Sequence, residues 1–153
     1  MNYETLLIAA HANSIDVYEV DLKGRIKGLY KDGIVWISKG MSTNEKHCVL
    51  AEEIGHHETS VGEILDQSDL RNRKQELQAK QWAYFSVIPL SVIVQAYQLH
   101  IKGRHDIADY LNVTEAFLQA AIDRYKEKYG LLAVYDDRYI VCFDPLGVIE
   151  IFE

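Results

Sequence analysis

NEKHCVLAEEIGHHE, residues Asn44–Glu58, is the segment from which both the fold and the chemistry of this chain can be inferred. As a helix it places Glu52 and His56 four residues apart on one face, with side chains about 6 Å apart at their roots, so that both can reach one metal ion. Glu53 points about 100° round the helix, because an α-helix has 3.6 residues per turn. The spacing therefore predicts a metal-binding helix in which Glu52 and His56 are ligands and Glu53 is a general base for a metal-activated water.

The frame of this motif has to be chosen, because His56 and His57 are adjacent. If His57 were the ligand, its partner would be Glu53 and the base position would fall on Ile54, which cannot carry a proton. If His56 is the ligand, the partner is Glu52 and Glu53 takes the base position. Only the second frame supplies all the parts, and it has the spacing of the H-E-x-x-H metallopeptidase motif, with Glu52 in place of the first histidine. His57 is then a surface or supporting residue.

LAEEIGHH, residues Leu50–His57, resembles the metal-binding helix of the ImmA/IrrE family of metallopeptidases, whose phage and integrative-element members often read AEELGHH there. The family's second element, Glu-x-x-Ala-x-x-aromatic-Ala, is similar to ELQAKQWA at Glu76–Ala83. The segments Gly28–Ile34 and Ile88-Pro89 also look like the family. The resemblance implies a zincin-like metallopeptidase core and, as partner and substrate, the helix-turn-helix repressor of a prophage or mobile element, which the peptidase would cleave as an antirepressor.

The resemblance also implies that Glu76 is the third metal ligand. The other interpretation is a surface glutamate that pairs with Arg73 or Lys80. Ala79 and Ala83 lie on the same helical face as Glu76, and such small residues let two helices approach closely. The ligands Glu52, His56 and Glu76 would leave a position open for water, as catalytic zinc sites do. Zinc is the metal we expect, and the second carboxylate makes manganese or iron better tolerated than in an all-histidine site.

Composition limits the class of protein. The formal charge of −7 argues against non-specific nucleic-acid binding, which needs a basic surface. Two cysteines without a C-x-x-C motif suggest neither a disulfide scaffold nor a thiolate zinc site. No basic-then-apolar leader opens the sequence, and the longest apolar run is too short to span a membrane. We therefore expect a cytoplasmic protein with no membrane contact.

The hydrophobic patterns predict an α+β fold. Residues 1–88 form the metallopeptidase-like core, and residues 89–153 form a helix-turn-helix-like helical lobe with closing strands, the two packed as one compact unit. The strand before the metal-binding helix is expected to be an edge strand that could pair with an extended substrate. Helices are predicted over 3–11, 44–58, 69–86, 90–102, 105–111 and 115–129, strands over 15–20, 33–38, 131–135, 139–143 and 148–152, and a loop over 59–68.

Three hypotheses about function follow. The first is a metal-dependent endopeptidase that acts on the repressor. The second is a non-catalytic antirepressor or protein-interaction module that keeps the metallopeptidase fold, which the missing first histidine would suggest. The third is a DNA-binding regulator that uses residues 105–129, which the balance of basic and acidic residues there disfavours.

Overall fold

The chain was analysed as a computed structural model, which describes residues 1–59 and 69–152. Most of the loop predicted over 59–68 therefore lies outside the described residues. The fold is α+β, as predicted, and the chain divides into two compact units, Met1–Ala83 and Tyr84–Glu153.

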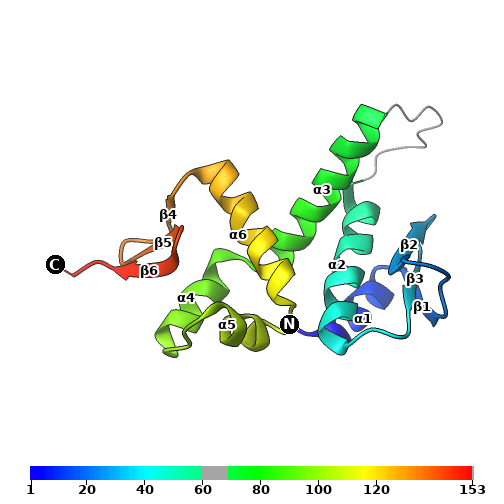
Figure 1. Cartoon of the computed structure of the whole chain (residues 1–153), viewed down its shortest axis with the longest axis horizontal. Coiled ribbons are helices and arrows are strands. Elements are labelled where there is room, and N and C mark those ends of the chain that lie inside the picture. The colour runs from blue at the N-terminus through cyan, green and yellow to red at the C-terminus, as the bar shows by residue number, and fades with distance from the viewer. Residues whose placement is uncertain (60–68, 153) are drawn as a thin grey trace. The chain divides into compact units, whose positions relative to one another are not determined.

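The first unit is built around a small sheet and two long helices (Figure 1). The last helix, α3, continues into the second unit. The elements are α1 (Tyr3–Ala12), β1 (Asp16–Val20), β2 (Gly28–Lys31), β3 (Ile34–Ser38), α2 (Thr43–Thr59) and α3 (Asp69–Val87).

The strand order in this sheet is β1-β3-β2, and it corrects one prediction. The strand directly before the metal-binding helix, β3, is central and not at an edge, because it pairs with β1 in parallel and with β2 in antiparallel fashion. Its side chains Val35 and Ile37 are fully buried. β2 lies outside the predicted strands, because it begins at Gly28 and glycine is a typical turn residue. Asp32 and Gly33 form the turn between β2 and β3, with positive φ at both residues, as a tight hairpin requires.

The predicted metal-binding helix is α2. Ser42 begins it, because the Ser42 hydroxyl accepts a hydrogen bond from the Glu45 backbone N–H at 3.2 Å. The core face of α2 carries Leu50, Ala51 and Ile54, all buried. Contacts with α1, β2 and β3 surround this face, so the helix is fixed in rotation about its axis. That rotation decides which way each candidate site residue points.

The close approach of α2 and α3 depends on a glycine. A Cβ atom built on Gly55 would collide with the backbone carbonyl of Ala79 on α3. Ala79 and Ala83 are themselves fully buried. The prediction that small residues bring these helices together is confirmed, and Gly55 is the partner residue on α2 that allows it.

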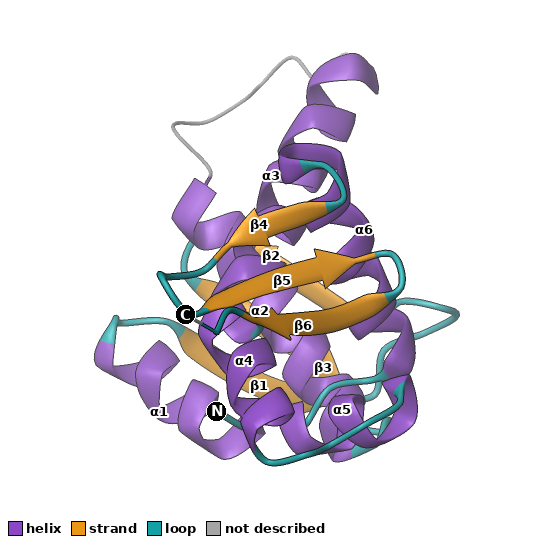
Figure 2. Ribbon diagram, turned by 90° about the vertical axis from the view of Figure 1, so that its left-hand side faces the viewer, coloured by secondary structure: helices purple, strands orange, loops and turns teal. Residues whose placement is uncertain are grey.

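The second unit contains three helices and a second sheet. Its strand order is β4-β5-β6, all antiparallel, and Figure 2 looks onto this sheet with its strands in the foreground. The helices α4 and α6 contact its strands. The elements are α4 (Leu90–Gln98), α5 (Arg104–Leu111), α6 (Glu115–Tyr129), β4 (Leu132–Val134), β5 (Tyr139–Phe143) and β6 (Leu146–Glu150).

Several boundaries in this unit differ from the prediction, by most at the end of α4 and at both ends of β6. Helix α4 ends at Gln98 and not at residue 102, because His100 takes a left-handed conformation with φ of 59°. Strand β6 begins at Leu146, since the chain turns already at Asp144-Pro145. Thr114 caps the start of α6, because its hydroxyl accepts a hydrogen bond from the Phe117 N–H at 3.1 Å. In the part of the chain that the structure describes, no helix combines the length and apolar character needed to cross a bilayer.

Candidate metal centre

Two of the predicted ligands meet across the contact between α2 and α3. His56 Nε2 lies 3.1 Å from Glu76 Oε2. The His56 side chain is 25% exposed and the Glu76 side chain 50% exposed, so the pair stands at the surface and is accessible. His56 follows Gly55 directly and Glu76 lies one helical turn before Ala79. The close backbone approach of Gly55 and Ala79 therefore brings the two side chains into contact.

The separation of these atoms suits a shared metal ion. Two ligand atoms each 2.0–2.1 Å from a tetrahedral zinc lie about 3.3 Å apart. Among the side chains that the structure describes, however, no group of three or more His, Cys, Asp or Glu residues is arranged to hold a metal. His56 and Glu76 therefore contact each other, and the roles of Glu52, His56 and Glu76 as metal ligands stay predictions.

Glu52 interacts electrostatically with the residues of α3 around this pair. Burial raises the pKa of the Glu52 carboxyl, Lys80 lowers it, Glu76 raises it and Lys27 lowers it. Glu76 and Lys80 are one turn apart on α3. The charges that act on the Glu52 carboxyl therefore come from the face of α3 that carries Glu76. A bound cation would relieve the cost of holding two carboxylates near each other in a partly buried place.

Glu53 lies on a different side of α2, against the edge strand β2. A Cβ atom built on Gly28 would lie 3.1 Å from Glu53 Oε1 and 2.6 Å from Val49 Cγ1. A side chain at position 28 would therefore require the Val49 side chain to move, and the Glu53 carboxylate lies directly against the strand. Burial, followed by the charges of Glu52 and Glu76, raises the pKa of Glu53 to about 7. A carboxyl with that pKa can take up and give back a proton near neutral pH, which a general base must do.

This raised pKa predicts a pH-dependent stability difference for Glu53→Gln. Below the ordinary pKa of 4.5, Glu53 is protonated in the folded and unfolded states alike and contributes nothing. Between pH 4.5 and 7 the unfolded chain ionises first, so the folded state loses stability, up to about 3 kcal/mol above pH 7. In chelator-treated protein, Glu53→Gln should thus be more stable than wild type at pH 8 and equal to it at pH 4. Urea unfolding at both pH values measures this, with the exposed Glu58→Gln as control; equal differences at both pH values would contradict it.

His57 belongs to a hydrogen-bond network that links α2 to the β2–β3 hairpin. The Gly33 N–H donates to the Tyr30 hydroxyl at 3.1 Å, and this hydroxyl lies 2.7 Å from His57 Nδ1. The two rings meet edge to face, with centroids 5.6 Å apart. His57 is thereby engaged as a supporting residue. Neither Tyr30 nor Gly28 was assigned a role from the sequence, although alternate residues of a strand share a face and Val49, Glu53 and His57 share a helical stripe.

We expect Tyr30→Phe to lower the free energy of unfolding by about 1 kcal/mol, because it removes both hydrogen bonds of the hydroxyl. Tyr18→Phe is a matched control, since Tyr18 lies on β1 of the same sheet and is 52% exposed. Urea denaturation of the two variants beside wild type gives the comparison. Equal stability of the two variants would mean that the network does not fasten β2 to α2.

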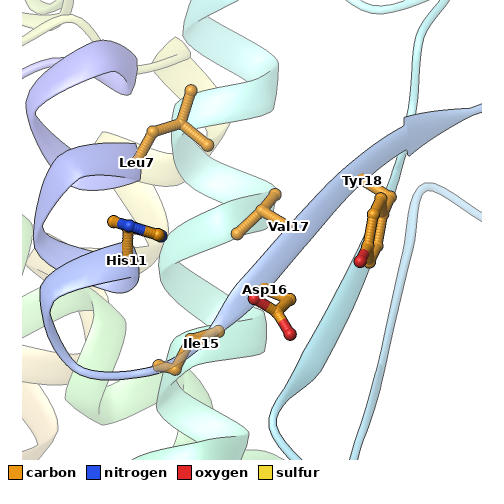
Figure 3. Close-up of a pocket in the computed structure, with 6 residues that line it drawn as sticks. All are labelled: Leu7, His11, Ile15, Asp16, Val17 and Tyr18. Carbon is orange, nitrogen blue, oxygen red and sulfur yellow. The ribbon is translucent and has the colours of Figure 1, made fainter.

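A separate cavity of about 200 Å³ lies between α1 and β1 (Figure 3). None of the predicted site residues lines it. His11, Asp16 and Tyr18 bring its polar side chains, and the other lining residues are apolar. Its lining residues are Leu7, His11, Ile15, Asp16, Val17 and Tyr18.

Comparison with known proteins identifies the fold that carries these residues. The family model described as the IrrE N-terminal-like domain, of the M78 peptidases, matches residues 4–123, which include α2, α3 and every predicted ligand. A comparison with curated protein sequences gave no match. A family match over most of the chain is consistent with the α+β architecture and with a metallopeptidase type of function that implies a divalent metal. The chain therefore belongs to the ImmA/IrrE family of metallopeptidases.

Proposed function

We propose that this protein is a metal-dependent endopeptidase that cleaves the helix-turn-helix repressor of a prophage or mobile element in the cytoplasm. The observation that carries the proposal is the contact between His56 and Glu76, because two ligand-type side chains from separate helices meet beside two partly buried glutamates. Glu52, His56 and Glu76 would hold the ion, zinc in the first place and manganese or iron otherwise. When bound, the ion polarises the attacking water and the peptide carbonyl.

The protein's own residues would divide the remaining work between two sides of α2. Glu53 would accept the proton of the attacking water and then deliver it to the leaving amine. The edge strand β2 is next to Glu53 and can pair with the main chain of an extended substrate. Gly28 supports this arrangement, because a side chain there would push on the Glu53 carboxylate.

The alternative is a non-catalytic antirepressor that binds the repressor without cutting it. Glu52 favours this alternative, because two glutamates and one histidine neutralise a divalent ion more fully than two histidines and one glutamate do. A more neutral site polarises water less. Both functions involve the same partner, so a binding measurement alone cannot distinguish them. Cleavage of the repressor has to be measured.

Metal analysis tests the proposed site directly. Wild-type protein should bind about one zinc ion per chain, and Glu76→Ala should weaken the affinity by at least about a hundredfold, because a ligand and its charge are lost. Glu58→Ala on α2 is the matched control, since Glu58 is an exposed carboxylate two residues beyond His56. Elemental analysis and titration calorimetry give the readouts. Equal zinc affinity in Glu76→Ala and wild type would remove Glu76 from the site.

A further inference from the structure

The outer face of the β4-β5-β6 sheet is apolar and exposed. In β5, Tyr139, Val141 and Phe143 are buried, and α4 and α6 contact this strand. Because side chains alternate along a strand, Ile140 and Cys142, which lie between these buried residues, point to the opposite face. Their cross-strand partners on β4 and β6 point to the same outer face. The register puts six residues on this outer face: Leu132, Val134, Ile140, Cys142, Gly147 and Ile149.

None of these six positions carries a charge. Leu132 is 48% exposed, Val134 66% and Ile149 51%. Nearby charged groups are instead paired at the ends of the sheet. Arg138 binds Glu150 at 2.8 Å, and Lys126 binds Asp144 at 2.7 Å. The result is an apolar surface with a polar rim, which is the composition of a protein interface.

The size of this surface is informative. Exposed apolar patches of more than a few hundred Å² are uncommon on monomers and mark interaction sites. The Ile151 N–H donates to the Arg138 carbonyl, so the alternation continues to Ile151, and with this residue the face offers roughly 400 Å² per copy. Two copies would bury about 800 Å², which is the size of a weak, transient interface and not of a permanent one. The area therefore suits a weak, reversible dimer.

The residues of the face are arranged so that it can pack on itself. The register forms two rows across the strands. One row, Val134, Ile140 and Ile149, is made only of branched side chains and forms a ridge. In the other row the side chains become smaller from β4 to β6: Leu132, Cys142 and Gly147. This row is called the shallow row.

A two-fold axis that lies between the two sheets and runs perpendicular to the strands would place the ridge of one copy over the shallow row of the other. Ile149 of each copy would then lie over Gly147 of its partner, and Ile140 over Cys142. Sheets that stack face to face interdigitate in this way about 10 Å apart. The absence of charge on the six positions matters too, because it places no like charges directly opposite each other when two chains of formal charge −7 meet.

We propose that the outer face of the β4-β5-β6 sheet is a dimerisation surface whose partner is a second copy of this chain, packed sheet on sheet about a two-fold axis. Such an interface is isologous, so each substitution acts twice in the dimer. It involves none of the residues of the metal centre, and it is independent of whether the protein is a peptidase.

Sedimentation velocity between about 1 and 200 µM protein tests the proposal. Wild type should shift from monomer to dimer across this range. Ile149→Lys on β6 and Val134→Lys on β4 should each raise the dissociation constant at least about thirtyfold, because each places two lysines in an apolar interface. Ile8→Lys is the matched control, since Ile8 lies on α1 and is 70% exposed. Circular dichroism checks that every variant is folded.

Loss of the dimer in both sheet variants, with the dimer kept in Ile8→Lys, supports the proposal. A wild-type chain that stays monomeric overturns it, as does a dimer that both sheet variants leave unchanged. A monomer whose binding to the repressor is lost in Ile149→Lys also overturns it, and would assign the face to the repressor instead.

Discussion

Glu53→Gln should lower peptide hydrolysis by about a thousandfold while the protein remains folded. Glutamine has the size and shape of glutamate but cannot accept a proton at neutral pH. The Glu53 carboxylate lies against Gly28 of the edge strand, so the substituted amide occupies the same space without a clash. The effect would therefore report lost chemistry and not altered packing.

The experiment uses a reporter gene under control of the repressor, with the chain supplied from a second promoter. Wild type should relieve repression and produce repressor fragments on a gel, whereas Glu53→Gln should do neither. Zinc content of the purified variant should equal that of wild type, because the three predicted ligands are untouched. Glu58→Gln, an exposed substitution five residues further along α2, is the control and should behave as wild type.

The outcome also decides between the two proposed functions. If Glu53→Gln relieves repression as well as wild type does and the repressor stays intact in both, the protein acts by binding. The peptidase mechanism would then be wrong, even though the metal could still be present. A variant that is inactive and has lost its zinc would place Glu53 among the ligands, which contradicts the frame chosen from the sequence.

The sequence predicted the helices better than it predicted the first sheet, for physical reasons. The caps at Ser42 and Thr114 and the residue spacing of α2 depend only on residues that are close in the sequence. The position of a strand within a sheet is a tertiary property. Nothing in the residues of β3 says that β2 pairs with it on the side away from β1.

The same distinction holds for the candidate site. Spacing within α2 could suggest that Glu52, Glu53 and His56 act together, because one helix fixes their relative directions. The contact of His56 with Glu76 depends on the packing of α2 against α3. The small residues Ala79 and Ala83 indicate this close packing in the sequence. The Tyr30–His57 network and the packing of Gly28 on Glu53 required β2, a strand that the sequence reading had missed.

Gly55→Ala should destabilise the protein by about 3 kcal/mol and separate His56 from Glu76. In an open helix this substitution would stabilise by about 1 kcal/mol, because alanine has the higher helix propensity. Here the added methyl group would overlap the Ala79 carbonyl of α3. Backbone atoms cannot avoid such an overlap by rotating, as a flexible side chain can. The two helices must move apart or one must distort, so the sign of the effect is reversed.

The separation of the helices gives a second readout that simple destabilisation does not. Because His56 and Glu76 flank the Gly55–Ala79 contact, Gly55→Ala should lower zinc affinity at temperatures where the variant is still fully folded. Gly40→Ala is the matched control, since a Cβ atom there meets no atom within 4 Å. Urea denaturation and zinc titration of both variants give the two measurements. A Gly55→Ala protein with the stability and zinc affinity of wild type would mean that α2 and α3 do not need this contact, and that the metal centre is not built on it.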